Sequence, residues 1–176
     1  MQQSTPTAPP PTHIPHRREC IHFWRAHDDG QSEHDLDRSD LILVGVSRSG
    51  KTSTALYLAT HYGLKVASYP LTPEDFERRH LPRALLAQKT SLILGLSTTP
   101  EHLSAVRNQY HPGSWYAAID NCRMEISAAE SMLRRYGIGW LSTANTSNQT
   151  NPNNPSAKDI ALVHLCRKIC TSLEYL

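Results

Sequence analysis

The chain has 176 residues, with 18 Lys and Arg, 16 Asp and Glu, a formal net charge of +2 and 39% hydrophobic residues. This length suits one domain with a real core, and a mild charge without a basic block does not indicate nucleic-acid binding. No apolar run is long enough to cross a bilayer, and no apolar signal region follows the N-terminus. We therefore expect no membrane partner and a cytoplasmic location.

Residues 1–18 form a proline-rich tail, with five prolines among Ser, Thr and Gln. This composition predicts a disordered or polyproline-like segment rather than a packed element. The folded domain is then expected over residues 19–176. Its first element is predicted as one or two helical turns over residues 19–27, ended by Asp28, Asp29 and Gly30.

The clearest motif of the chain is a complete G-x-x-x-x-G-K-[ST] loop. It consists of Gly45, Val46, Ser47, Arg48, Ser49, Gly50, Lys51 and Thr52. The apolar run 41–46 before it is typical of a strand buried on both faces of a parallel sheet, and a helix is predicted after it, from about residue 50 to 62. Because strand, loop and helix are the context that this motif requires, the sequence predicts a nucleotide-binding site.

The residue types of the loop suit phosphate chemistry. Backbone N–H groups of a glycine-rich loop and of a helix N-terminus bind anions. We expect Lys51 to reach the β-phosphate of a nucleotide and Thr52 to offer its hydroxyl to Mg²⁺. Arg48 is either a second cation near the phosphates or a solvated surface arginine, and the sequence leaves both open.

Strands and helices alternate after the loop. The strands are predicted at 64–69 (closed by Pro70), 91–97 and 138–142, the helices at 100–110, 116–136 and 157–174, a loop with a short helix at 72–90, and a flexible polar insertion at 144–157. This order predicts an α/β fold, a three-layer P-loop domain with a mostly parallel sheet. Right-handed crossovers would place the loop at the carboxyl edge of the sheet.

None of the predicted strands ends in Asp or Glu, although many P-loop proteins hold Mg²⁺ with such a residue. The acidic candidates must therefore come from loops, and they are Asp28, Asp29, Asp40, Glu74, Asp75 and Asp120. Asp28 and Asp29 form the densest cluster, beside His27. They are either an acidic turn that ends a helix or the groups that provide a metal ligand and a general base.

Several segments, taken in order, resemble one family: the bifunctional serine/threonine kinase and phosphorylase proteins, which regulate phosphoenolpyruvate synthase or pyruvate, phosphate dikinase. The similar segments are residues 26–30, 45–52, 56–59, 65–71, 94–97, 100–103 with Arg107, 116–117, 122–125 and 138–143. The resemblance covers about residues 20–165 and is closest to the phosphoenolpyruvate synthase regulatory branch.

The resemblance implies a paired activity. ADP would donate a phosphoryl group to a threonine of phosphoenolpyruvate synthase (pyruvate, water dikinase) and inactivate it, and inorganic phosphate would remove that group and release pyrophosphate. Together with the loop and the acidic cluster, this activity predicts catalytic roles for Lys51, Asp28 and Asp29 and Mg²⁺ as the metal, and a homodimer is one candidate assembly.

One departure from the family concerns the N-terminal side. Family members carry a sizeable further domain before this segment, so we expect residues 19–176 to correspond to the catalytic part, with that domain absent. Two alternatives follow: a non-catalytic nucleotide-binding remnant, and a small-molecule kinase or NTPase. The missing strand-end acid disfavours the second alternative, although the 72–90 segment could serve such an enzyme as a lid.

Overall fold

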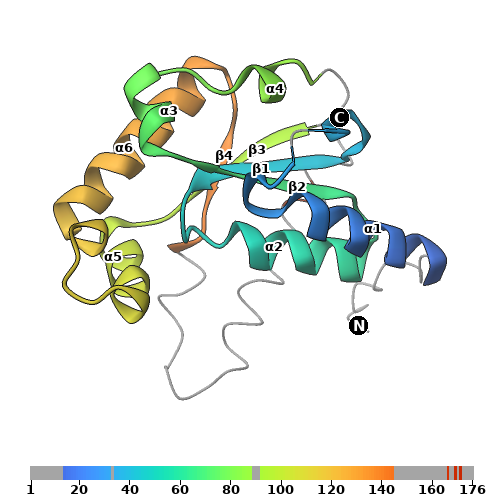
Figure 1. Cartoon of the computed structure of the whole chain (residues 1–176), viewed down its shortest axis with the longest axis horizontal. Coiled ribbons are helices and arrows are strands. Elements are labelled where there is room, and N and C mark those ends of the chain that lie inside the picture. Colours follow the sequence, from blue (N-terminus) through green and yellow to red (C-terminus); the bar gives the residue numbers. More distant parts are fainter. Residues whose placement is uncertain are drawn as a thin grey trace, which may run out of the picture.

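A parallel sheet organises the part of the chain that the computed structural model describes, residues 14–32, 34–88 and 92–144 with Cys166, Ile169 and Thr171. Its strands are β1 (Leu41–Val46), β2 (Val66–Leu71), β3 (Leu92–Ser97) and β4 (Trp140–Ser142). They lie in the order β2-β1-β3-β4, and every ladder between these neighbours is parallel (Figure 1). The predicted α/β fold with a parallel sheet is confirmed.

Helical segments connect the strands. They are α1 (Ile14–His27), η1 (Asp28–Gly30), η2 (Leu36–Arg38), α2 (Lys51–Tyr57), η3 (Leu58–Tyr62), α3 (Pro73–Arg78), α4 (Arg83–Leu86), α5 (Pro100–Tyr110), η4 (Trp115–Ala117) and α6 (Ile119–Arg135). Local sequence explains several ends. The Thr99 side chain accepts a hydrogen bond from the His102 N–H at the start of α5, and Gly63 (φ 67°) ends η3 in the left-handed region.

Helices cover both faces of the sheet. Every residue of β1 is buried. Ile42 and Val44 point into a core that includes Leu103 of α5 and Leu133 of α6, whereas the alternate positions Leu41 and Leu43 point into a second core that includes Ala55 and Leu58 of the α2–η3 segment. Figure 1 accordingly shows α2 on one side of the strands and α4 and α6 on the other. This alternation is the three-layer arrangement that the sequence predicts.

Several predicted boundaries are wrong: the strands expected from residues 64 and 138 begin at Val66 and Trp140, and the helix expected at 116–136 is η4 followed by α6. Two further differences have a clear physical reason. The strand expected to close at Pro70 continues through it to Leu71. A proline lacks the N–H that a central strand needs, but β2 is an edge strand of the described sheet and tolerates it. In addition, α1 begins at Ile14, so residues 14–18 of the expected tail are helical.

Contacts with the body of the domain stabilise this early start of α1. His16 Nε2 donates to the Gly63 carbonyl at 2.9 Å, and the Cys20 thiol donates to the same oxygen at 3.0 Å. These tertiary contacts outweigh the poor helix-forming composition around Pro15.

Parts of the prediction fall outside the described residues: positions 1–13 of the tail, most of the polar insertion, and most of the helix expected at 157–174. Cys166, Ile169 and Thr171 are helical, and the first two are buried in the core that contains Leu41 and Leu43. Among the helices described, none combines the length and the apolar character that a membrane crossing demands.

Candidate functional site

The segment from β1 to α2 makes a tight turn at the carboxyl end of the strand. Ser49 N–H donates to the Val46 carbonyl at 3.2 Å, and Gly50 adopts φ 91°, which an L side chain rarely does. A Cβ at Gly45 would lie 2.2 Å from the Leu96 carbonyl oxygen. Both glycines of the motif are therefore required by the backbone, and the strand, turn and helix occur where the sequence predicts them.

Lys51 lies inside this turn. Its side chain is 3% exposed, and its Nζ donates to the Val46 carbonyl at 2.8 Å. Burial lowers the pKa of Lys51 to about 8, and the nearby carboxylates of Asp29 and Asp28 oppose that shift. A buried ammonium is costly without a charged partner, so an anion in the turn would stabilise it.

Two acids predicted from the sequence lie next to Lys51 and Thr52. The Asp28 Oδ1 atom accepts hydrogen bonds from Ser68 Oγ at 2.6 Å and from Thr52 Oγ1 at 3.2 Å. Asp29 N–H donates to Ser68 Oγ at 2.8 Å. We call Asp28, Asp29, Thr52 and Ser68 the acidic side of the loop.

Ser68 is a member of the acidic side that the sequence does not single out. It is 2% exposed on β2 and connects both acids, which come from η1 almost forty residues earlier in the chain. Its hydroxyl fixes the Asp28 carboxylate close to the Thr52 hydroxyl. A signal for Ser68 existed only in its position within the 65–71 segment of the family resemblance.

The other acidic candidates have structural roles away from the loop. Asp75 forms a capping box with Thr72 at the start of α3. Asp40 accepts from the Lys65 N–H at 2.8 Å, and Asp120 pairs with Arg123 along α6. Glu74 is exposed in the first turn of α3. Of the six candidates, Asp28 and Asp29 are therefore the two that lie beside the loop.

A buried arginine contacts the loop from the opposite direction. Arg107 of α5 is 0% exposed, and its Nη2 donates to the Ser47 carbonyl at 3.2 Å and to Glu125 Oε2 at 2.6 Å. Its guanidinium lies 3.9 Å from the centre of the Tyr116 ring, and the Tyr116 hydroxyl donates to Ser47 Oγ at 3.1 Å. We call Ser47, Arg107, Tyr116 and Glu125 the arginine side of the loop.

Arg48 lies at the solvent edge of the turn. Its backbone adopts φ 71°, its side chain is exposed, and its guanidinium lies 4.1 Å from the centre of the Tyr110 ring, which is 57% exposed. The side chain is therefore exposed and packed against an aromatic ring. This position is compatible with both predictions from the sequence, a second cation near the phosphates and a solvated surface arginine.

Hydroxyl groups line the neighbouring strand ends. Thr143, after β4, donates from Oγ1 to the Ser97 carbonyl at 3.0 Å and approaches the Ser49 carbonyl at 3.3 Å. Ser49 Oγ and Thr98 Oγ1 are buried without a hydrogen-bond partner among the described residues. Because buried hydroxyls normally have a hydrogen-bond partner, each of these two can still form a hydrogen bond with a further polar group near the loop.

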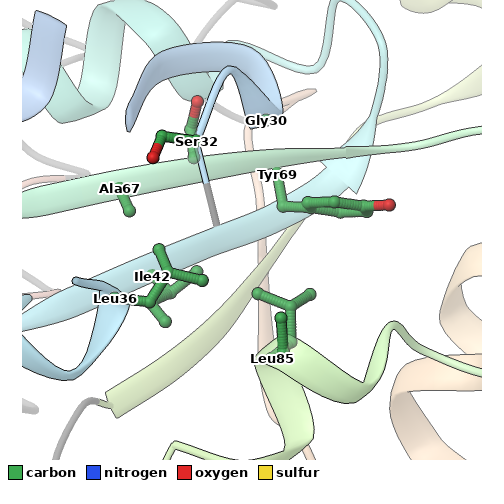
Figure 2. A pocket seen from close by; sticks show the side chains of 9 residues that line it. Gly30, Ser32, Leu36, Ile42, Ala67, Tyr69 and Leu85 are labelled. Atoms are coloured by element: carbon green, nitrogen blue, oxygen red, sulfur yellow. The ribbon is translucent and has the colours of Figure 1, made fainter. Parts of the chain in front are cut away.

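A small pocket lies beneath the segment that carries the two acids. Figure 2 shows it lined by Gly30, Ser32, Leu36, Ala67, Tyr69 and Leu85, among others. Its lining is mostly apolar and includes no residue of the 45–52 loop. Ser68 of the acidic side also lines it, so the pocket belongs to the packing under η1 and β2 beside that side rather than to the 45–52 loop.

Within the described residues, no group of three or more His, Cys, Asp or Glu side chains is arranged to hold a metal. Asp28 and Thr52 supply two hard oxygen atoms, a donor set that fits Mg²⁺ when phosphate oxygens and water complete its coordination.

Comparison with known proteins identifies relatives of the chain. A family model described as kinase/pyrophosphorylase matches residues 10–150. Proteins named "Putative phosphoenolpyruvate synthase regulatory protein" are 61% identical in Albidiferax ferrireducens, 60% in Cupriavidus metallidurans and 59% in Cupriavidus necator, each over 131 residues. These alignments cover 74% of the chain and 48%, 48% and 49% of the relatives, so the chain spans about half the length of the curated relatives it matches.

Proposed function

The chain belongs to the kinase/pyrophosphorylase family, and from this premise we propose that it transfers the β-phosphoryl group of ADP to a threonine of phosphoenolpyruvate synthase. We also propose the opposing reaction, in which inorganic phosphate removes that group. The observation that carries both is the convergence of Lys51, Thr52 and Asp28 at one strand–turn–helix junction.

Two features of the loop support a diphosphate as the ligand. Gly50 at φ 91° keeps the backbone open at the start of α2, where a Cβ would meet only Thr143 Cγ2, at 3.8 Å. Lys51 is buried beside this point, and burial lowers its pKa to about 8. Phosphate oxygens would favour its protonated form, and Lys51 would in turn stabilise negative charge as it shifts during transfer.

In the forward reaction, the threonine oxygen attacks the β-phosphorus of ADP, the bond from that phosphorus to the bridging oxygen breaks, and AMP leaves. The threonine proton needs an acceptor. Asp28 accepts hydrogen bonds from two hydroxyls, whereas the Asp29 side chain is exposed at the mouth of the site. We therefore assign Asp29 as the base and Asp28 as the partner of Thr52.

In the opposing reaction, an oxygen of inorganic phosphate attacks the phosphorus of phosphothreonine. The threonine hydroxyl leaves with a proton, and pyrophosphate is the product. A site that holds the diphosphate of ADP also holds pyrophosphate, so one set of residues serves both directions.

Mg²⁺ fits the oxygen pair of Asp28 Oδ1 and Thr52 Oγ1, which lie 3.2 Å apart. When bound there, it would neutralise charge on the phosphate oxygens. Ser68 supports this pair by holding the Asp28 carboxylate from β2.

Transfer of label from ADP tests the proposal. The purified chain is mixed with ADP labelled at the β-phosphate and with phosphoenolpyruvate synthase carrying its phosphohistidine. Labelled phosphothreonine and an equal amount of AMP are expected, and label returns as pyrophosphate after inorganic phosphate is added. Lys51→Ala should slow both reactions about 100- to 1000-fold. Lys65→Ala is the matched control, because Lys65 pairs with Glu19 at the opposite, amino edge of the sheet.

Other outcomes identify the alternatives. ATP hydrolysis or transfer to a small molecule without phosphothreonine would indicate a small-molecule kinase or NTPase. Binding of ADP without any turnover would indicate a nucleotide-binding protein that is not catalytic. Either result would overturn the proposed reaction.

A further inference from the structure

Complete burial of Arg107 is a costly arrangement. Its side chain is 0% exposed, its ion-pair partner Glu125 is 13% exposed, and its Nε is buried without a hydrogen-bond partner among the described residues. Apolar side chains often replace a buried ion pair without loss of stability. The presence of an arginine here therefore calls for a role beyond packing.

That role is suggested by what Arg107 contacts. Nη2 donates to the carbonyl of Ser47 at 3.2 Å, and Nη1 donates to the carbonyl of Tyr116 at 2.9 Å. One planar group thus connects α5, the η4 segment and the first residue of the turn. A lysine carries the same charge but does not present this rigid fork of donors.

Tyr116 adds a second connection to the same residue. Its ring lies under the Arg107 guanidinium at 3.9 Å, and its hydroxyl donates to Ser47 Oγ at 3.1 Å. Ser47 is therefore held at its backbone carbonyl by Arg107 and at its side chain by Tyr116. The next residue, Arg48, adopts φ 71°, so the turn changes direction immediately after this anchor.

We propose that Arg107 and Tyr116 are positioning residues that hold Ser47 so that the 47–50 turn and Lys51 fit a nucleoside diphosphate. This inference rests on the proposed function. Neither residue needs to contact the ligand, since both act through Ser47. Asn121 Nδ2 donates to Glu125 Oε1 at 2.9 Å and holds the carboxylate that orients Arg107.

A double-mutant cycle between Tyr116 and Ser47 tests the proposal, with dissociation constants for ADP and pyrophosphate measured by calorimetry and the Tm measured in parallel. Tyr116→Phe keeps the ring over the guanidinium and removes only the hydroxyl. Tyr116→Phe and Ser47→Ala should each raise the dissociation constants of ADP and pyrophosphate about 3- to 10-fold, the scale of one neutral hydrogen bond. The Tm should change little. The double variant should be no weaker than the worse single variant, because the two changes remove one shared contact.

Arg107→Lys tests the fork directly. Loss of the charged hydrogen bond to the Ser47 carbonyl should weaken the binding of ADP roughly 10- to 100-fold. Arg123→Lys is the control, since Arg123 is exposed and pairs with Asp120 on the surface of α6. It should bind ADP like the unchanged protein.

The outcomes separate this inference from the proposed function. If the unchanged protein binds neither ADP nor pyrophosphate, both fail. If the unchanged protein binds both ligands and the folded Arg107→Lys and Tyr116→Phe variants bind them equally well, only the positioning role is overturned. Additive effects of Tyr116→Phe and Ser47→Ala would also overturn the positioning role. If Arg107→Lys fails to fold, the double-mutant cycle between Tyr116 and Ser47 tests the positioning role by itself.

Discussion

The acidic side and the arginine side hold the same loop in opposite ways. On the acidic side, Thr52 and Asp29 are exposed and Asp28 is half-buried, and only Ser68 behind them is buried. On the arginine side, Arg107 is fully buried and Glu125 is nearly so. Both sides form hydrogen bonds of comparable length with the loop. They therefore differ in solvent exposure and not in how closely they contact it.

This difference separates two tasks within one site. Groups that bind a metal, accept a proton or meet an incoming hydroxyl must reach solvent, whereas groups that fix the backbone work best when desolvated and immobile. Substitutions of Asp28, Asp29 or Thr52 should therefore change ligand binding and rate with little loss of stability. Substitutions of the buried ion pair, Arg107 and Glu125, should change stability as well.

Glu125→Gln should give the largest loss of stability. It leaves the buried Arg107 charge without its partner, which costs about 3–5 kcal/mol in the free energy of unfolding. Urea denaturation measures the change. Asp120→Asn removes an exposed ion pair on the same helix and should cost less than about 1 kcal/mol. Equal losses for the two variants would contradict the contrast between buried and exposed pairs.

Lys51→Ala should give the largest loss of activity. Removing one preorganised cation from a phosphoryl-transfer site lowers the rate about 100- to 1000-fold. The rate of AMP formation from ADP reports this loss, and Lys65→Ala should retain the original rate. Full activity of Lys51→Ala would show that the chemistry occurs elsewhere.

Asp28→Asn and Asp29→Asn should have different effects, because we assign a metal ligand to Asp28 and the base to Asp29. Asp28→Asn should weaken ADP binding about 10-fold or more when Mg²⁺ is present and much less when it is absent, because it removes a charged metal ligand. Asp29→Asn should lower the transfer rate and leave the Mg²⁺ dependence intact. Calorimetry with and without Mg²⁺ distinguishes them, and identical behaviour of the two variants would refute the assigned roles.

The pH dependence should follow Lys51, whose pKa burial lowers to about 8. Phosphate binds the charged form, so ADP affinity should fall above pH 8, by up to about tenfold per pH unit. Unfolding restores the ordinary pKa near 10.5, so the unfolded state holds more protons between these values. Lys51 should therefore contribute stability that rises from pH 8 to 10.5 in the ligand-free protein, measured as the difference from Lys51→Met, and this variant should also lose the pH dependence of ADP affinity.

Arg48→Ala should have the smallest effect. Arg48 is exposed and stacked on Tyr110, so its contribution to phosphate binding is screened by salt. We expect ADP to bind about two- to threefold more weakly at low salt and equally at high salt. An unchanged dissociation constant at low salt would identify Arg48 as a solvated surface residue.

Local sequence signals predicted the centre of the domain well. The apolar run ending at Val46, the glycines at 45 and 50 and the helix after Lys51 all occur where the pattern indicates. The helix predicted at 100–110 begins and ends at those residues, with Thr99 as its cap. These features depend on residues close together in the chain, which a sequence pattern contains.

Features that depend on distant residues were mispredicted or not found. The start of α1 at Ile14 depends on contacts with Gly63, and the passage of β2 through Pro70 depends on its edge position. The ion pair of Arg107 and Glu125 joins two helices, and Asp28 meets Thr52 and Ser68 only after the chain folds. No local pattern encodes these pairs, because packing brings them together.

Competition between ligands for one site tests most directly whether the loop around Lys51 binds a diphosphate. ADP, pyrophosphate and AMP are titrated into the protein with Mg²⁺, singly and in competition. We predict that ADP and pyrophosphate bind and displace each other, and that AMP binds at least about tenfold more weakly because it lacks the second phosphate. Lys51→Ala should lose the preference for ADP and pyrophosphate over AMP. Tight binding of AMP that pyrophosphate does not displace would contradict this account.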